Sequence, residues 1–325
     1  MTTKNKVLSV LEKNKGKHIS GSKIAEELNI SRNSIWKAIK SLQDEGHKIS
    51  AVTNKGYSLD LQNRLLSSQS ISKHLKSDMF DIKTYKTLES TNSLLKLDAE
   101  AEAPTGTIVI SEEQTKGRGR MGRSFYSPGN TGIYMSILLR PKISAYESLS
   151  ITTCAAVAVA EAIEMNSNKK AEIKWVNDIF VDNKKVCGIL TEASLDLENG
   201  GLRYAILGIG INVFAPRKGF PDDIASTSTS IFQDEDCSGE RRSKLIADIL
   251  IIFFNYYKHI QEKAFLEEYK KRSLILNKEI NIIRGKNTLE KAIALDIDEQ
   301  FRLKVKKENG EIEYLNSGEV SIRKT

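Results

Sequence analysis

The sequence predicts an α+β protein of three domains, and three observations support this fold class. Residues 1–62 carry helical apolar spacings followed by a short hairpin pattern. Residues 63–272 mix apolar strands with helices, which predicts an α/β domain built on a mixed sheet. Residues 273–325 alternate apolar and polar side chains, as a small β domain does. A length of 325 residues is enough for two or three domains.

Composition excludes several classes of protein. Hydrophobic residues make up 40% and charged residues 28%, which is ordinary for a soluble globular chain. The longest apolar run, residues 151–165, contains threonine and glutamate, so we expect a core helix there and no membrane association. The N-terminus lacks the apolar segment of a secretory signal. Cys154, Cys187 and Cys237 form no CxxC pair or metal-ligand spacing, so we expect a reduced, cytoplasmic protein without a protein-bound metal site.

The basic surplus of the chain is concentrated at its N-terminus. Residues 1–60 hold 11 Lys and Arg against 6 Asp and Glu, whereas residues 61–325 hold 38 against 36. This location favours an anionic partner such as DNA. A solvated, lysine-rich face is the alternative interpretation.

Apolar spacing in the first sixty residues predicts three helices. The second and third follow Ser20 and Ser31, which are suited to N-caps, and a tight turn joins them. A polar and basic face on the third helix makes the pair a candidate helix-turn-helix. Two β-prone segments around Asn54-Lys55-Gly56 then predict a hairpin, which completes a winged helix. The residues expected to contact operator DNA are Arg32, Asn33, Ser34, Lys37, Lys40 and Lys55. A protein-interaction module of the same fold is the alternative.

Two polar segments stand out in the first half of the central region. Ser90-Thr91-Asn92 precedes a helical stretch, where hydroxyls cap the helix or meet a ligand. Residues 117–123 alternate glycine with arginine between two apolar strands, without the spacing or lysine of a P-loop. Glycines allow close backbone approach, and arginines fit phosphate or carboxylate oxygens. We therefore predict a ligand-binding loop, with a flexible basic or RNA-binding tract as the alternative.

Two further segments place polar groups in apolar strands. Residues 172–192 predict two strands, 173–181 and 185–192, with Lys174, Asn177 and Asp178 close together. Polar side chains in such a run need a buried partner or a ligand, so the alternative is a hairpin with a satisfied Asn/Asp pair. Residues 205–214 predict a strand whose glycines permit close approach, followed by Asn212.

These four segments, in this order, resemble the biotin–protein ligase family. The matching signatures are Ser90-Thr91-Asn92, Gly117-Arg118-Gly119-Arg120, Lys174-Trp175-x-Asn177-Asp178 with Lys185-x-x-Gly188, and Gly208-x-Gly210-x-Asn212. With the winged helix in front, nearly the whole chain is similar to the bifunctional ligases that also repress the biotin operon. The resemblance implies an SH3-like barrel as the C-terminal β domain. It also implies synthesis of biotinyl-adenylate from biotin and ATP with Mg²⁺, followed by transfer of biotin to a lysine of a biotin carboxyl carrier protein domain.

The resemblance implies a role for each matching residue. Lys185, Arg118, Arg120 and Asp178 would be catalytic. The biotin pocket would comprise Ser90, Thr91, Asn92, Gln114, Arg118, Gly119, Arg120, Lys185 and Gly188. The ATP or adenylate would contact Arg120, Lys174, Asn177, Asn212 and Phe125. Binding of adenylate would order residues 117–125 and 213–224 and favour a homodimer on two-fold DNA.

Two positions depart from the family pattern. Val176 stands where proline is usual, which frees a backbone N–H and relaxes φ. Phe125 stands where tryptophan is common, and it keeps an apolar ring.

A lipoate or octanoate ligase and a ligand-sensing regulator without catalysis are the competing functions. The Gly-Arg loop and the winged helix argue against the first, and Arg118, Arg120 and Lys185 against the second. The pattern also predicts one long helix over residues 241–272 and a hairpin turn at Glu308-Asn309-Gly310.

Overall fold

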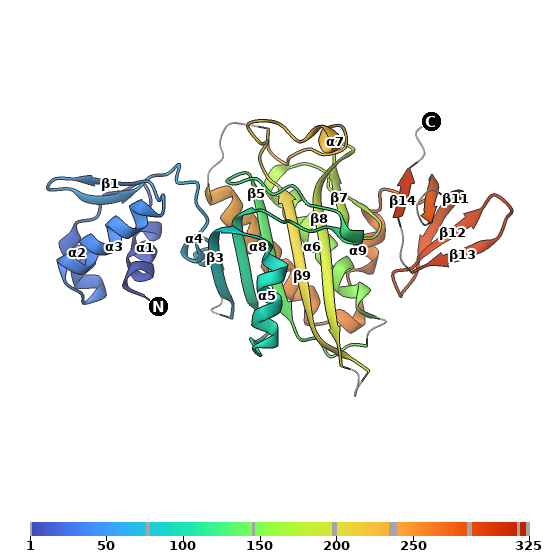
Figure 1. Cartoon of the computed structure of the whole chain (residues 1–325), viewed down its shortest axis with the longest axis horizontal. Coiled ribbons are helices and arrows are strands. Elements are labelled where there is room, and N and C mark those ends of the chain that lie inside the picture. Colours follow the sequence, from blue (N-terminus) through green and yellow to red (C-terminus); the bar gives the residue numbers. More distant parts are fainter. Residues whose placement is uncertain are drawn as a thin grey trace.

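The computed structural model describes residues 2–75, 79–144, 147–196, 200–233, 239–284, 288–316 and 319–322. A helical domain with a β-hairpin, a central sheet with helices, and a small β domain follow one another along the longest axis (Figure 1). The predicted fold class is therefore confirmed. Cys237 lies outside the described residues, while Cys154 and Cys187 are buried and free.

The N-terminal domain has three helices, α1 (Thr3–Lys13), α2 (Gly21–Leu28) and α3 (Arg32–Asp44). The Ser20 and Ser31 side chains accept from the backbone N–H groups of Lys23 and Ser34, so both predicted N-caps are confirmed. Asn29 ends α2 in the left-handed conformation, which makes the tight turn into α3. The core is apolar and includes residues of every helix: Val7, Leu8, Leu11, Ile24, Ile35, Ala38, Ile39 and Leu42.

The predicted hairpin consists of β1 (Ile49–Val52) and β2 (Gly56–Leu59), which pair antiparallel. Gly56 has φ of +95°, and a Cβ there would lie 2.1 Å from the carbonyl oxygen of Ile19. Only glycine fits this close approach. The hairpin is thereby fixed against the segment before α2 by the bridge between Ile19 and Tyr57.

The segment after the hairpin is anchored to the central domain. Arg242, fully buried in α8 (Gly239–Tyr257), donates to Glu112 Oε2 at 2.7 Å and to the carbonyl of Arg64. Glu112 also accepts from the backbone N–H of Leu66. Residues 64–66 are thus held by a buried ion pair, and the short helix α4 (Ser68–Ser72) follows directly.

The central domain is built on a mixed sheet, seven-stranded within the described ranges, of order β3-β4-β5-β9-β8-β7-β6. β3 and β4 are parallel and the other neighbours antiparallel. Central strands are covered on both faces, so β5 is buried along its whole length. The bounds are β3 Asp81–Leu88, β4 Thr107–Gln114, β5 Gly132–Leu139, β6 Glu172–Lys174, β7 Asp178–Val181, β8 Lys184–Leu195 and β9 Leu202–Asn212.

Helices cover both faces of this sheet (Figure 1). α5 (Thr91–Glu100) packs on β4, β5 and β9, while α6 (Leu149–Ser167) and α8 pack together on the other face. α6 is long and apolar enough to cross a membrane, but 72% of its apolar window is buried inside the protein. It is the predicted core helix. The loop at 213–224 is confirmed up to α7 (Asp222–Ala225).

Two sequence predictions about the central domain are wrong. The single helix over 241–272 is α8, a 3₁₀ turn η3 (Ile260–Glu262) and α9 (Leu266–Lys271), with Lys263 at a φ of +53° between them. The single strand over 173–181 is the hairpin β6–β7, with Lys174 paired to Asp178. The Trp175–Val176 peptide bond in its turn is cis.

The C-terminal domain is a sheet, five-stranded in the described ranges, of order β13-β12-β11-β10-β14. The bounds are β10 Glu279–Arg284, β11 Thr288–Ile297, β12 Leu303–Lys307, β13 Ile312–Leu315 and β14 Glu319–Ile322. The predicted small β domain and the turn at 308–310 are confirmed. The Trp175 indole donates to the carbonyl of Phe301 at 2.9 Å, which joins this domain to the β6–β7 hairpin.

Candidate functional site

A cavity of about 350 Å³ opens over the centre of the sheet. This volume is in the range of small-molecule sites. The N-terminus of α5, the loop 117–125, the β6–β7 turn and strands β8 and β9 contribute its walls. The C-terminal domain closes one side through Ile283, Val320 and Ser321.

One end of the cavity offers neutral hydrogen-bonding groups. Gln114 Oε1 accepts from Thr91 N at 2.9 Å and from Thr91 Oγ1 at 3.1 Å. Asn92 Oδ1 lies 2.6 Å from Ser136 Oγ, and Asn92 Nδ2 donates to Glu192 at 2.7 Å. These bonds hold the amides in fixed orientations. This end therefore suits a polar, uncharged group with both donors and acceptors.

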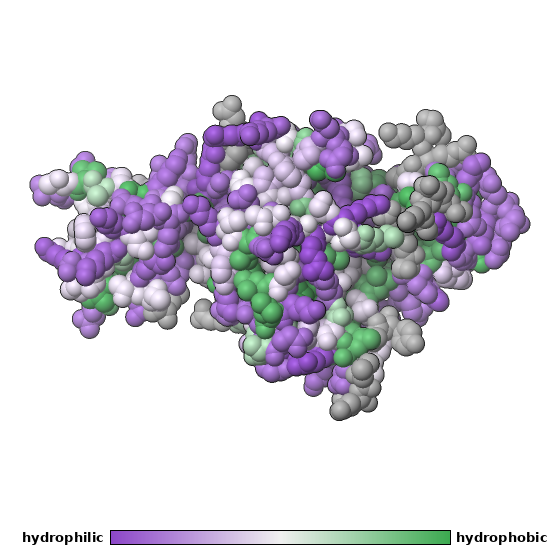
Figure 2. Space-filling model, in the orientation of Figure 1, coloured by the Kyte–Doolittle hydropathy of each residue, from purple (hydrophilic) through white to green (hydrophobic). Residues whose placement is uncertain are grey.

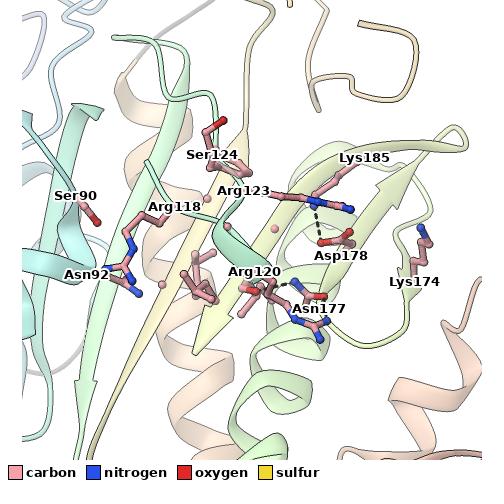
Figure 3. A pocket seen from close by; sticks show the side chains of 18 of the residues that line it. Ser90, Asn92, Arg118, Arg120, Arg123, Ser124, Lys174, Asn177, Asp178 and Lys185 are labelled. Carbon is pink, nitrogen blue, oxygen red and sulfur yellow. Dashed lines mark hydrogen bonds and ion pairs between the residues drawn. The ribbon is translucent and has the colours of Figure 1, made fainter. Parts of the chain in front are cut away.

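The other end is cationic (Figure 3). Lys185 Nζ lies 2.6 Å from Asp178 Oδ1, and Arg120 Nη1 donates to Asn177 Oδ1 at 2.9 Å. Asn177 Nδ2 in turn donates to the carbonyl of Ile189 on β8. Asn177 thereby fixes the Arg120 guanidinium against the sheet. Preorganised cations of this kind stabilise negative charge that builds up on phosphate or carboxylate oxygens.

The Gly-Arg loop is a small hairpin. Phe125 N donates to Gly117 O at 2.9 Å, and Gly119 N donates to Arg123 O at 2.7 Å. Between these bonds, Arg118 and Ser124 are paired in an isolated antiparallel β-bridge. The 3₁₀ turn η1 (Arg120–Gly122) forms its tip. Glycine at 117 is required because a Cβ there would lie 2.3 Å from the carbonyl of Phe125.

The Phe125 ring lies on two paired glycines. Gly188 of β8 and Gly210 of β9 are cross-strand partners. A Cβ on Gly210 would lie 2.6 Å from the ring, and one on Gly188 would lie 3.3 Å from it. Two residues before Gly210 on β9, Gly208 is constrained in the same way, because a Cβ there would lie 2.4 Å from Asn92 Oδ1. Because these glycines have no side chains, Phe125 and Asn92 lie directly on the backbone of β8 and β9, which forms the floor of the site.

Cys187 plays no part as a nucleophile. It is fully buried between Lys185 and Gly188, and burial raises the pKa of its thiol. A neutral buried thiol is inert.

Comparison with known proteins gives the family. Residues 84–212 match the Biotin/lipoate A/B protein ligase family, residues 3–58 an HTH domain, and residues 275–323 the Biotin protein ligase C terminal domain. The bifunctional ligase/repressor BirA of Bacillus subtilis is 38% identical over 251 residues, which are 76% of this chain and 76% of that protein. The chain belongs to the biotin–protein ligase family.

Other family members are similar over longer stretches. BirA of Escherichia coli is 28% identical over 95% of this chain and 94% of its own length. Among solved structures, a biotin protein ligase from Aquifex aeolicus in complex with biotin and ATP has a TM-score of 0.59 and 28% identity. That match covers 75% of this chain and 99% of the Aquifex chain.

Most of the residues that the sequence assigned to the ligase site line this one cavity. They are Ser90, Thr91, Asn92, Gln114, Arg118, Gly119, Arg120, Phe125, Lys174, Asn177, Asp178, Lys185 and Gly188. Lys174 Nζ lies 5.8 Å from the centre of the Phe180 ring. Asn212, at the end of β9, is not among the lining residues, so its contact with adenine stays a prediction.

The sequence did not single out several residues that line or brace this cavity. Glu192 accepts from Arg118 Nη2 at 2.6 Å through one oxygen and from Asn92 through the other, so it joins the Gly-Arg loop to α5. Arg123 lines the cavity, and its place in the alternating glycine–arginine segment 117–123 was the signal available for it. No local pattern marks Ile283, Val320 and Ser321, because tertiary docking alone brings them to the site.

The candidate DNA-binding residues lie on α3 and at the tip of the hairpin. Those with exposed side chains are Arg32, Asn33, Lys37, Lys40 and Lys55. Ser34 is half-buried, and its hydroxyl lies 2.9 Å from that of Ser31. Ser34 therefore serves the N-cap of α3 in this structure, which reduces its freedom to contact a base.

Proposed function

We propose that this chain is an ATP-dependent biotin–protein ligase that also represses transcription of biotin synthesis or transport genes. The observation that carries the proposal is the cavity, which combines a neutral hydrogen-bonding end with a cationic end. Biotin has a polar, uncharged ureido ring at one end and a carboxylate at the other. Leu190, which shares a sheet face with Gly188 and Gly208, and the Phe125 ring supply apolar surface for the carbon chain between them.

The neutral end would bind the biotin ring. Gln114, Thr91 and Asn92 present donors and acceptors that their neighbours already orient. Ser90 caps α5 through the N–H of Ser93 and adds a hydroxyl nearby. Gly119 and Gly188 supply space rather than contacts. Preorganised polar groups of this kind reject ligands that leave them unpaired.

The cationic end would carry the chemistry. The biotin carboxylate attacks the α-phosphorus of ATP, a C–O–P linkage forms, and the bond to the leaving pyrophosphate breaks. Lys185 and Arg120 would balance negative charge on the reacting oxygens, while Asp178 holds Lys185 in place. Arg118 is paired with Glu192 beside Asn92, so it would join them by exchanging that carboxylate for the bound ligand. A lysine amine of the carrier domain then attacks the mixed anhydride, forming an amide and releasing AMP. Positioning and charge stabilisation dominate both steps.

The remaining assignments concern the nucleotide. Lys174 and Asn177 border the cationic end, and the Phe125 ring offers an apolar face beside it. Asn212 would contact the adenine once the loop 213–224 closes over the bound adenylate. Closure of this kind excludes water from a hydrolysable anhydride.

Mg²⁺ would accompany ATP. Among the described residues, Asp178 is the only carboxylate lining the cavity, and no group of three or more His, Cys, Asp or Glu side chains could hold a metal ion. This donor set fits an ion held chiefly by the phosphates, with at most one protein carboxylate. When bound, Mg²⁺ neutralises charge on the phosphate oxygens.

The partners and organisation follow from the same proposal. Residues 1–62 would bind operator DNA, residues 63–272 catalyse, and residues 273–325 form the SH3-like domain. The acceptor would be the biotin carboxyl carrier domain of a cytoplasmic carboxylase. Adenylate would favour a homodimer, which places two α3 helices on a two-fold DNA site.

One experiment tests the enzymatic proposal directly. The protein is incubated with ATP, Mg²⁺ and equimolar biotin, lipoate and octanoate, and the adenylates are identified by mass spectrometry. We expect biotinyl-adenylate alone. Lipoyl- or octanoyl-adenylate would move the chain to the lipoate side of its family, and absence of any adenylate would leave a ligand-sensing regulator.

A further inference from the structure

Trp36 is a large aromatic side chain on the otherwise polar, exposed face of α3. Its side chain is 52% exposed, whereas the buried positions of α3 are Ile35, Ala38, Ile39 and Leu42. Helical spacing puts Trp36 on the same face as Arg32, Asn33 and Lys40. In Figure 2 the visible face of this domain is mostly hydrophilic, with only small hydrophobic areas.

In the part of the chain that the structure describes, Trp36 takes no part in the core of its domain. The domain core is complete without it, and tryptophan is a mediocre helix former. The contact with the catalytic domain is made by α1 instead, where Glu12 pairs with Lys73 at 3.1 Å. A single exposed apolar side chain is common on protein surfaces, but this one stands among the cations of the helix expected to enter the DNA groove, where it is accessible to a base.

The surroundings of Trp36 identify the kind of partner. Lys40 Nζ lies 5.3 Å from the centre of the indole ring. Arg32, which also donates to Ser22, stands one turn before Trp36 on the same face, and Lys37 is exposed at the next position of the helix. These charges are complementary to phosphates on either side of a groove. Within the major groove, the apolar group that a side chain can contact is the 5-methyl group of thymine.

We propose that Trp36 reads a thymine methyl group in each half of the operator. The inference rests on the proposed repressor function. The cations of α3 would position the helix on the backbone, and the indole would then cover the methyl group and exclude water from it. Trp36 would thus determine sequence specificity, a role distinct from that of the phosphate-contacting lysines.

The test begins with selection of binding sites from a pool of random-sequence DNA duplexes, using the full chain with biotin and MgATP. In a selected duplex each thymine is then replaced by deoxyuridine, which removes only the methyl group. For the unsubstituted protein we expect one thymine per half-site where replacement weakens binding about fourfold, the effect of burying one methyl group. Trp36→Ala should abolish that difference, Trp36→Phe should keep part of it, and Lys37→Ala should weaken all duplexes alike while keeping it.

The possible outcomes distinguish a failure of the Trp36 proposal from a failure of the proposed repressor function. Retention of the full thymine–deoxyuridine difference by Trp36→Ala overturns the inference, and so does the absence of any methyl effect with the unsubstituted protein. Selection that returns no preferred sequence overturns the proposed repressor function itself. Affinity of Trp36→Ala for unselected duplex DNA close to that of the unsubstituted protein establishes that its N-terminal domain is folded. If the variant fails this check, the scan with Trp36→Phe decides instead.

Discussion

Lys185 Nζ and Asp178 Oδ1 lie 2.6 Å apart across the neighbouring strands β8 and β7, at the cationic end of the cavity. Both side chains are partly exposed, at 32% and 23%. A solvent-accessible ion pair contributes little to stability. The pair is therefore better understood as holding an ammonium group where a reacting oxygen can reach it.

Replacing Lys185 should impair adenylate formation much more than it weakens biotin binding. We expect Lys185→Ala to lower kcat about 10²- to 10³-fold, since one preorganised charge is lost from the transition state. ATP–pyrophosphate exchange at saturating biotin measures this. Lys184→Ala is the matched control, because Lys184 is the exposed neighbour on the same strand and does not line the cavity. A Lys185→Ala enzyme within threefold of the unsubstituted protein would remove Lys185 from the reaction.

Gly208 should be essential to the neutral end of the site. The Cβ of Gly208→Ala would lie 2.4 Å from Asn92 Oδ1, so the amide must move and its bond to Glu192 must break. We expect the Kd for biotin, measured calorimetrically without ATP, to rise about tenfold, which corresponds to about 1.4 kcal/mol. Gly201→Ala is the control, because its Cβ would meet only Ile143 O at an ordinary 3.5 Å.

A double-mutant cycle identifies the cause of that effect. If displacement of Asn92 explains it, Gly208→Ala combined with Asn92→Ala should bind biotin no more weakly than Asn92→Ala alone. Additive losses would mean that Gly208 acts through some other contact.

Local features of the sequence predict local structure well in this chain. The N-caps Ser20 and Ser31 and the hairpin at Gly56 depend on neighbours a few residues away, so the winged helix followed from the sequence. The site motifs likewise identify residues that line one cavity. The sequence contains the glycines at 188 and 210, but their pairing under Phe125 requires the order of β8 and β9, which local pattern does not encode.

The two wrong elements have tertiary causes. Apolar residues continue with helical spacing past Tyr257, yet Phe265 stacks on Phe301 of the C-terminal domain at 5.2 Å, and the chain turns at Lys263 to reach it. The strand over 173–181 is interrupted where Trp175 donates to Phe301 O and where Tyr269 donates to Val176 O. Contacts with side and main chains about a hundred residues away, one in α9 and one in the C-terminal domain, override a continuous β-prone run.

The buried pair of Arg242 and Glu112 should be a stability determinant. Arg242→Met leaves the Glu112 carboxylate buried without its cation and frees the Arg64 carbonyl. We expect the free energy of unfolding to fall by about 3–5 kcal/mol in denaturant titrations. Arg242→Met with Glu112→Gln should lose clearly less than the sum of the single changes. The exposed pair of Arg203 and Glu102, 2.7 Å apart, is the matched control and should give little change when either partner is removed. Equal effects at both pairs would contradict this account.

His47 should make the N-terminal domain less stable in mild acid. Its ring is buried, and burial lowers its pKa below the usual 6.5, although Glu12 and Glu45 partly oppose this. The Asn63 amide is oriented by accepting from Lys48 N at 3.1 Å, so its NH₂ group faces His47 Nδ1 at 3.4 Å. That nitrogen must be unprotonated to accept the bond.

The sign of the pH dependence follows from this lowered pKa. Below about pH 6.5 the unfolded chain takes up a proton that the folded domain resists, so the stabilisation is complete above that pH and is lost as the pH falls through the folded pKa. Between pH 7.5 and 5.5 we expect a decrease on the order of 1 kcal/mol in the free energy of unfolding. In a Trp175→Phe background, Trp36 is the remaining tryptophan, and its fluorescence follows this domain. His47→Gln should flatten the pH dependence, while the exposed His18→Gln should not. A slope unchanged by His47→Gln would assign the acid sensitivity to another group.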